Sequence, residues 1–168
     1  MNITPYRLRL IKRPGMHEQS IARLRKWFDA HPAHAAAVFS AAIEIRETIY
    51  RLLQSVASSS APVREDLRRL NNALSDAEPR ALLARADGVF GWRIEVKPTD
   101  AGIHAPLLWS AADILVGLDS ARVRECANDR CLWLFLDNSK NGSRRWCSMQ
   151  ACGNRAKAHR HYLRQKRA

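Results

Sequence analysis

The four cysteines of this chain form two close pairs. Four residues separate Cys126 from Cys131 and Cys147 from Cys152, and fifteen residues lie between the pairs. Structural Zn²⁺ takes four ligands in a tetrahedron, and two such pairs brought face to face supply four thiolates. Because a closed shell leaves no position for a substrate, the spacing predicts one structural Zn²⁺ that does no chemistry.

Two disulfides are the alternative, and they would require an oxidising compartment. The segment MNITPYRLRLIKRPG carries basic residues where a signal peptide has an apolar stretch. No part of the sequence approaches the ~20 apolar residues of a membrane span. We therefore expect a cytoplasmic protein with reduced cysteines and without a membrane partner.

The charge of the chain is concentrated beside the cysteines. The formal net charge is +12, and residues 121–168 carry 12 Lys and Arg against 3 Asp and Glu, a net of +9. Residues 1–120 carry 16 against 13, a net of +3. A basic, metal-bound module on a nearly neutral body indicates a polyanionic partner, most simply nucleic acid.

The elements that position these residues are mostly helical. Apolar residues at helical spacing predict helices over 17–30, 32–58 and 104–119. Val63, Leu67, Leu70 and Leu74 mark a further helix, the third in chain order, with Pro62 near its first position. Alternation predicts a strand at Tyr6–Leu10 and a β-hairpin near 80–97, with Asp87-Gly88 as its turn. The expected core comprises Ile45, Ile49, Leu52, Leu67, Leu70, Leu74, Leu108 and Leu115.

The region after residue 120 has the order of a zinc finger. We expect a knuckle at Cys126–Cys131, a β-hairpin formed by 132–136 and 144–146, and a final helix capped by Ser148. The fold class predicted is α+β, mostly α: a helical domain with a small antiparallel sheet over 1–120, then a treble-clef finger over 121–168. A ligand pocket is a further hypothesis, between Trp92 and Trp109 where helix and hairpin meet.

The final helix carries a basic face. Lys157, Arg160, Arg164 and Arg167 follow at i, i+3, i+7 and i+10, and no acidic residue occurs between Gly142 and Ala168. Such side chains neutralise phosphates, and arginine also binds guanine edges. A solvated surface helix is the alternative. The full set of expected nucleic-acid contacts is Arg144, Arg145, Arg155, Lys157, Arg160, Arg164, Lys166 and Arg167.

These motifs resemble a known family. Arg144-Arg145-Trp146-Cys147-Ser148-Met149 and Cys152-Gly153-Asn154-Arg155 are similar to the CGNR zinc finger of bacterial proteins. Ile45-Arg46-Glu47 and Leu70-Asn71-Asn72-Ala73-Leu74 more loosely resemble the ABATE domain, which commonly precedes that finger in stress-induced transcription regulators. The resemblance implies a DNA-binding finger in which Cys152 is a ligand and Gly153 permits close backbone approach. It implies local hydrogen bonding or DNA contact for Asn154 and Arg155.

We therefore expect a transcription regulator with one zinc ion, DNA as partner, and a first domain that senses a small molecule or forms a homodimer. A protein–protein module in which the finger only braces the first domain is the alternative. We expect no enzyme, because the sequence has no catalytic constellation.

Overall fold

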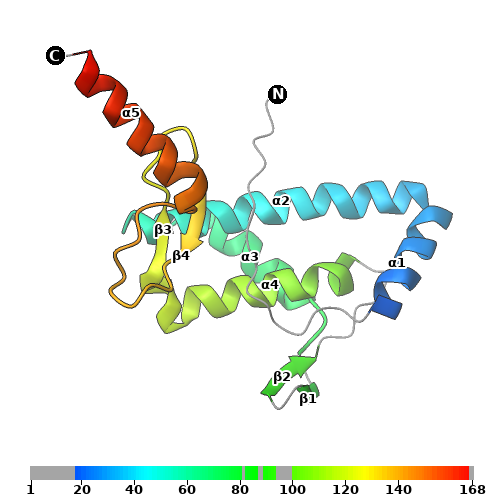
Figure 1. The fold of residues 1–168 in the computed structure, drawn as a ribbon. Helices are drawn as coiled ribbons and strands as arrows, with labels where there is room; N and C mark the ends of the chain where they lie inside the picture. Colours follow the sequence, from blue (N-terminus) through cyan, green and yellow to red (C-terminus); the bar gives the residue numbers. More distant parts are fainter. Residues whose placement is uncertain (1–17, 81, 87–88, 94–99, 167–168) are drawn as a thin grey trace. The chain divides into compact units, whose positions relative to one another are not determined.

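The computed structural model describes residues 18–80, 82–86, 89–93 and 100–166, and it is mostly helical (Figure 1). This confirms the expected fold class, while the strand expected at Tyr6–Leu10 lies outside the described residues. In chain order the elements are α1 (Glu18–Ala30), α2 (Pro32–Ala57), α3 (Arg64–Asp76), β1 (Leu82–Ala86), β2 (Val89–Arg93), α4 (Asp100–Val116), η1 (Leu118–Arg122), β3 (Val123–Glu125), β4 (Leu134–Leu136), η2 (Met149–Gly153) and α5 (Asn154–Gln165).

Two helix boundaries differ from those expected. α3 begins at Arg64 and not at Pro62, because Val63 is extended and its carbonyl accepts the first helical hydrogen bonds. Glu65 and Asp66 then lie in the first turn, where the positive end of the helix dipole stabilises their carboxylates. α4 begins at Asp100, four residues earlier than expected, and the residues after Val116 turn into the short 3₁₀ helix η1.

The helical core lies among α2, α3 and α4. Ile49, Leu52 and Leu108 are each 1% exposed and Leu70 is buried, as expected. Ile45, Leu74 and Leu115 are half-buried. The prediction for Leu67 was wrong, since this side chain is 39% exposed. The buried residues of α3 are Asp66 and Leu70, four positions apart, and Leu67 lies one position off that stripe.

An ion pair joins α2 to α3 beside this core. Arg51 donates from Nε and Nη2 to the two carboxylate oxygens of Asp66, at 2.9 and 2.7 Å. Asp66 is 5% exposed, and its hydrogen bond from Arg51 holds the pKa of the carboxyl below its ordinary value. A buried charge is stable only when it is paired in this way.

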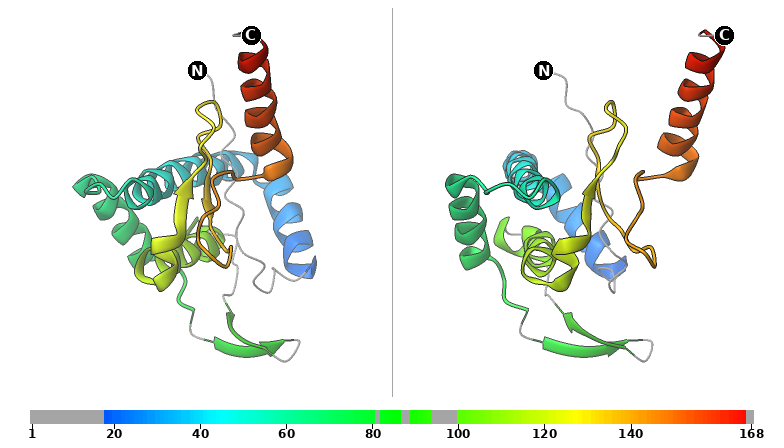
Figure 2. Two further views of the ribbon diagram at one scale, coloured as in Figure 1. Left: turned by 60° about the vertical axis from the view of Figure 1, so that its left-hand side comes forward. Right: turned by 90° about the vertical axis from the view of Figure 1, so that its left-hand side faces the viewer.

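The expected hairpin near 80–97 is confirmed. β1 and β2 pair antiparallel from Leu82↔Arg93 to Ala86↔Val89, on either side of the Asp87-Gly88 dipeptide. It belongs to the larger of two compact units, together with α1, most of α2, α3 and α4. The smaller unit holds residues 118–168 with 53–61, and within it α5 leads away from the β3–β4 hairpin in both views of Figure 2. No helix in the described ranges is long and apolar enough to cross a bilayer.

Candidate metal centre

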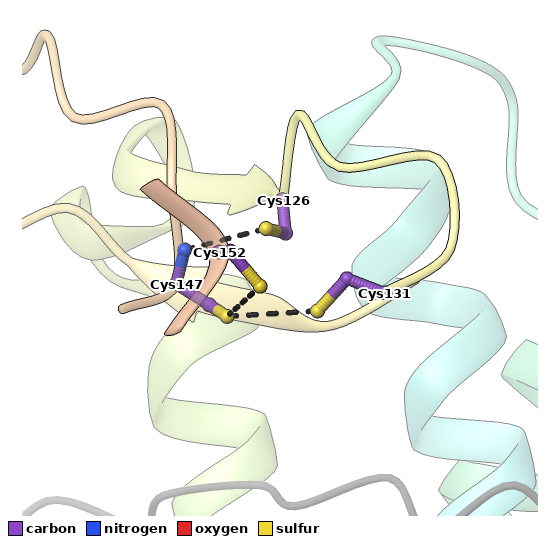
Figure 3. A group of neighbouring side chains, drawn as sticks. All are labelled: Cys126, Cys131, Cys147 and Cys152. Atoms are coloured by element: carbon purple, nitrogen blue, oxygen red, sulfur yellow. Dashed lines mark hydrogen bonds between the residues drawn. The ribbon is translucent and has the colours of Figure 1, made fainter. Parts of the chain in front are cut away.

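The four cysteines converge in the smaller unit (Figure 3). Their sulfur atoms all lie within 4.8 Å of one another. Cys131 Sγ is 3.6 Å from Cys147 Sγ, which is 3.7 Å from Cys152 Sγ. Cys126 and Cys152 are buried, whereas Cys131 and Cys147 are half-buried.

These distances fit a metal ion and not disulfide bonds. A Zn–S bond of about 2.3 Å places tetrahedral sulfurs about 3.8 Å apart, close to the spacings observed. A disulfide would bring two sulfurs to about 2.05 Å. All four thiols are free. The donor set is also the soft thiolate set that favours zinc among divalent ions.

The first two ligands lie in the loop that joins β3 to β4. These strands pair antiparallel from Val123↔Leu136 to Glu125↔Leu134, and Cys126 N–H donates to Trp133 O at 2.8 Å to close the loop. Asn128 shapes the turn between the cysteines, since its Oδ1 accepts from Arg130 N–H and its carbonyl accepts from Cys131 N–H. The cysteine loop is therefore the connection of the hairpin.

The expected pairing of 132–136 with 144–146 was wrong, because β4 pairs with β3 and residues 144–146 are not a strand. Only one backbone hydrogen bond ties that segment to the first cysteine loop, from Ala127 N–H to Arg145 O at 2.8 Å. Cys147 N–H additionally points to Cys126 Sγ at 3.5 Å, an N–H···S contact between the two pairs.

The second pair is held at the start of the final helix. Ser148 is extended, and its hydroxyl accepts from Ala151 N–H, so the expected cap is confirmed. The first turn is the π-helical segment η2, in which Cys152 N–H and Gly153 N–H both donate to Ser148 O. Cys152 thus lies where the helix dipole favours a thiolate.

Gly153 is closely packed against side chains of the cysteine segment. A Cβ atom at this position would collide with the Met149 sulfur and would lie 3.2 Å from Trp146 Cδ1. The adjoining Asn154 uses its backbone N–H in the helix, and its side chain is exposed. Among the described residues Asn154 makes no side-chain hydrogen bond, so the structure offers no local bonding role for it.

Asp137 and Arg144 organise the loop between the cysteine pairs. Asp137 is 0% exposed, with Oδ1 accepting from Ser139 N–H and Oδ2 from Arg144 N–H, at 2.9 and 2.8 Å. The Arg144 guanidinium donates to the carbonyls of Trp146 and Cys147 and lies over the Phe135 ring. Sequence reasoning missed Asp137. The signal in the sequence that could have identified it is an acidic residue directly after the apolar residues 132–136 in a basic segment.

Burial raises the pKa of the Cys131 thiol. Burial and the adjoining sulfurs also raise the pKa of the Cys147 thiol. Four thiolates at these separations repel one another, and a dication offsets that repulsion. Thiols that are crowded and partly desolvated therefore require the metal if all four are to ionise.

The basic residues that are expected to contact nucleic acid differ in how the structure places them. Arg145, Arg155, Lys157, Arg160, Arg164 and Lys166 are all exposed. Arg144 is also exposed, but two of its nitrogens already bind carbonyl groups beside the zinc ligands. Arg167 lies outside the described residues.

A pocket was expected between Trp92 and Trp109, and of these two residues the structure describes only the side chain of Trp109. Trp109 donates from Nε1 to Glu78 O at 2.9 Å, and Arg80 lies over its ring, 4.8 Å from the centroid. Arg80 also pairs with Asp113 at 2.6 Å. The side chain of Trp92 lies outside what the structure describes. Trp109 is therefore held by a hydrogen bond to the backbone and by the Arg80 guanidinium over its ring.

Comparison with known families matches both parts of the chain. The CGNR zinc finger matches residues 122–165. ABATE, described as "Putative stress-induced transcription regulator", matches residues 14–118. A search of curated proteins gave no match. The converging cysteines, at zinc-binding distance within a CGNR finger, form one structural zinc site. The chain accordingly belongs to the ABATE family and carries a CGNR zinc finger.

Proposed function

We propose that this protein is a cytoplasmic transcription regulator that binds DNA through its zinc finger, and that it catalyses no reaction. The observation that carries the proposal is the open basic side of α5. Lys157, Arg160 and Arg164 share one side of the helix and are exposed. The ABATE description supports a regulatory role.

The electrostatics of the finger favour a polyanion. Within the described residues no α5 side chain forms an ion pair, whereas Arg68 and Arg69 on α3 both pair with Glu65. Segment 142–168 has no acidic residue that could balance its cations. Ordinary exposed helices mix charges, so an unbalanced helix is better explained by a phosphate backbone than by solvation alone.

The zinc site supplies the rigidity that such a contact needs. Zn²⁺ bound to the cysteines fixes the start of α5 through Cys152, and η2 leads directly into the helix. We assign this arrangement, in which a cysteine loop connects the β3–β4 hairpin and a ligand-bearing helix follows, to the treble-clef class. In that arrangement α5 enters a groove, and the exposed Asn154 and Arg155 in its first turn are placed to contact bases or phosphates.

One short helix reads few base pairs, so specificity needs a second copy or a partner. We propose that the ABATE domain supplies the second copy by forming a homodimer. A small-molecule ligand or stress signal would act through the same domain. Specific complexes of this kind bury more surface than a single small finger offers.

Fluorescence anisotropy of a labelled duplex at low salt tests the proposal. The zinc-loaded full chain should bind, and Arg160→Ala/Arg164→Ala should bind several-fold more weakly because two phosphate contacts are lost. The matched control is Arg23→Ala/Arg25→Ala, which removes the same charge from exposed positions on α1. The control should bind like the wild type.

Two results would contradict the proposal. If both double variants weaken binding equally, the effect is one of total charge and α5 is not the contact. If the wild-type protein does not bind DNA, the finger acts as a brace in a protein–protein module. The exposed Met149, Tyr162 and Leu163 would then be the side chains to examine.

A further inference from the structure

The four zinc ligands are not equally protected from solvent. Cys126 and Cys152 are each 5% exposed, whereas Cys131 and Cys147 are half-buried. Solvent access is one condition for a reactive cysteine, whereas buried cysteines are inert.

The two half-buried cysteines are also neighbours. Cys131 Sγ and Cys147 Sγ are 3.6 Å apart and come from different pairs, one from the β3–β4 loop and one from the segment before η2 (Figure 3). Forming a disulfide requires them to approach to about 2.05 Å, a movement of about 1.5 Å. Cys131 and Cys147 are therefore the two least buried of the four cysteines and are also close neighbours.

We propose that Cys131 and Cys147 form a peroxide-sensitive pair whose oxidation opens the zinc site. Zinc, when bound, holds the cysteines as thiolates, the form that peroxides oxidise. One thiolate attacks a peroxide oxygen, the O–O bond breaks, and a sulfenic acid and hydroxide form. The second thiolate attacks the sulfenic sulfur, forming the S–S bond and releasing a second hydroxide. Two thiolates lose two electrons and hydrogen peroxide gains them.

The product cannot keep the metal. A Cys131–Cys147 disulfide removes one ligand from each pair, and the remaining Cys126 and Cys152 are too few for a structural site. The start of α5 is anchored through Cys152, so metal loss releases the helix from its support. This inference does not depend on DNA binding, because zinc content and thiol state are its readouts.

Zinc-loaded full-length protein treated with hydrogen peroxide tests the pair. A chromogenic chelator should record release of the bound zinc, and a thiol reductant with added zinc should reverse it. Tryptic cleavage places Cys131 on 131–140, Cys126 on 125–130, and Cys147 with Cys152 on 146–155. We expect a disulfide between 131–140 and 146–155, with fragment ions assigning it to Cys147.

Other disulfides would overturn the proposal. A first-formed Cys126–Cys131, Cys147–Cys152 or Cys131–Cys152 bridge would show that exposure does not select the site. Retained zinc, with oxidation confined to the exposed Met149, would show that the cluster resists peroxide. Met149→Leu separates methionine oxidation from the thiol reaction and should leave zinc release unchanged.

Two histidine variants provide a matched comparison, because imidazole nitrogen is also a zinc ligand. Cys126→His keeps both members of the pair, so peroxide should still form the Cys131–Cys147 cross-link and release the zinc. Cys131→His removes one member, so the cross-link is lost and release should slow. Equal release rates from the two zinc-loaded variants would contradict the assignment of Cys131 and Cys147 as the sensitive pair. If either variant fails to hold zinc, the disulfide map of the wild type decides which cysteines react.

Discussion

A single carboxylate, Asp137, organises the loop that connects the two cysteine pairs. It is fully buried, accepts hydrogen bonds from the N–H groups of Ser139 and Arg144, and receives the Arg122 guanidinium on its own carbonyl. The Ser139 side chain and these N–H groups lower the pKa of Asp137, so it is ionised. Arg144 then reaches the carbonyls next to the zinc ligands. Asp137 therefore supports Cys147 without touching the metal.

Replacing Asp137 by alanine should weaken zinc binding by about 10–100-fold, the range for lost supporting contacts around a metal. The change leaves the two N–H groups without their buried acceptor. Competition with a chelator of known affinity measures the effect. Asn138→Ala, at the exposed neighbouring position, is the control and should change little. Wild-type affinity in Asp137→Ala would mean that the loop does not position the ligands.

Gly153→Ala should destabilise the finger although alanine is the better helix former. The φ of Gly153 is −64°, so the backbone accepts alanine, and the cost arises from contact with Met149 and Trp146. Met149 is half exposed and can be shortened, so Met149→Ala should restore part of the lost melting temperature in the double variant. A double variant no more stable than Gly153→Ala alone would place the strain at Trp146.

At the scale of elements, α5 depends on the metal site. It has 12 residues, and isolated helices of that length are marginal in water. Of its side chains that the structure describes, all but Ala156 are exposed. Its stability therefore comes from the Ser148 cap and from Cys152 at its start, and little from packing further along.

Removing zinc should unfold α5 and leave the core shared by α2, α3 and α4 intact, because none of the four zinc ligands lies in that core. Hydrogen exchange followed by mass spectrometry, with and without a chelator, resolves the regions. Peptides covering 154–165 should lose protection on chelation, while peptides covering 41–52 should not. Equal loss throughout would show that the metal stabilises the whole chain as one cooperative unit.

The pairing of α2 with α3 makes stability depend on pH. Arg51→Ala removes charged hydrogen bonds to buried Asp66 and should cost about 1.5–3 kcal/mol at neutral pH, nearer the lower value because Arg51 is 43% exposed. The hydrogen bond from Arg51 lowers the pKa of Asp66. The stability that the Arg51–Asp66 pair contributes is therefore complete above the ordinary carboxyl pKa of about 3.9. It is lost as the pH falls through the lower pKa that Asp66 has in the folded protein.

Denaturant unfolding of wild type and Arg51→Ala at matched pH values measures this contribution. The difference in unfolding free energy should be constant above about pH 5 and should shrink in more acidic solution. Arg46→Ala is a useful comparison, since Arg46 pairs with its neighbour Glu47 on the same helix. A difference for Arg51→Ala that persists unchanged into acid would assign its effect to packing of the aliphatic side chain.

At the scale of the whole molecule, the sequence predicts the local patterns well and the long-range ones poorly. Cysteine spacing and helical periodicity are local, so the zinc ligands and α1 and α2 could be predicted. The partner of β4 is not local: 132–136 could pair with a strand on either side, and turn-rich 137–142 favoured the wrong one. Asp137 stabilises that turn from inside, a burial that composition does not reveal.

Charge segregation is the remaining property of the whole molecule, and it leads to a salt prediction. The finger carries +9 and residues 1–120 only +3. Six exposed residues of the finger are candidates for phosphate contact: Arg145, Arg155, Lys157, Arg160, Arg164 and Lys166. If each of them meets a phosphate, log affinity against log salt should have a slope of about −5. Between 50 and 200 mM salt the affinity would then fall about a thousandfold.

Arg160→Ala/Arg164→Ala should make that slope less negative by about 1.8, since each contact contributes about 0.9. Arg23→Ala/Arg25→Ala, with the same total charge, should leave the slope unchanged. The slope separates contact from steering, because charges distant from the DNA alter affinity with little counterion release. Equal changes in slope for the two variants would mean that the neutralised phosphates do not lie along α5.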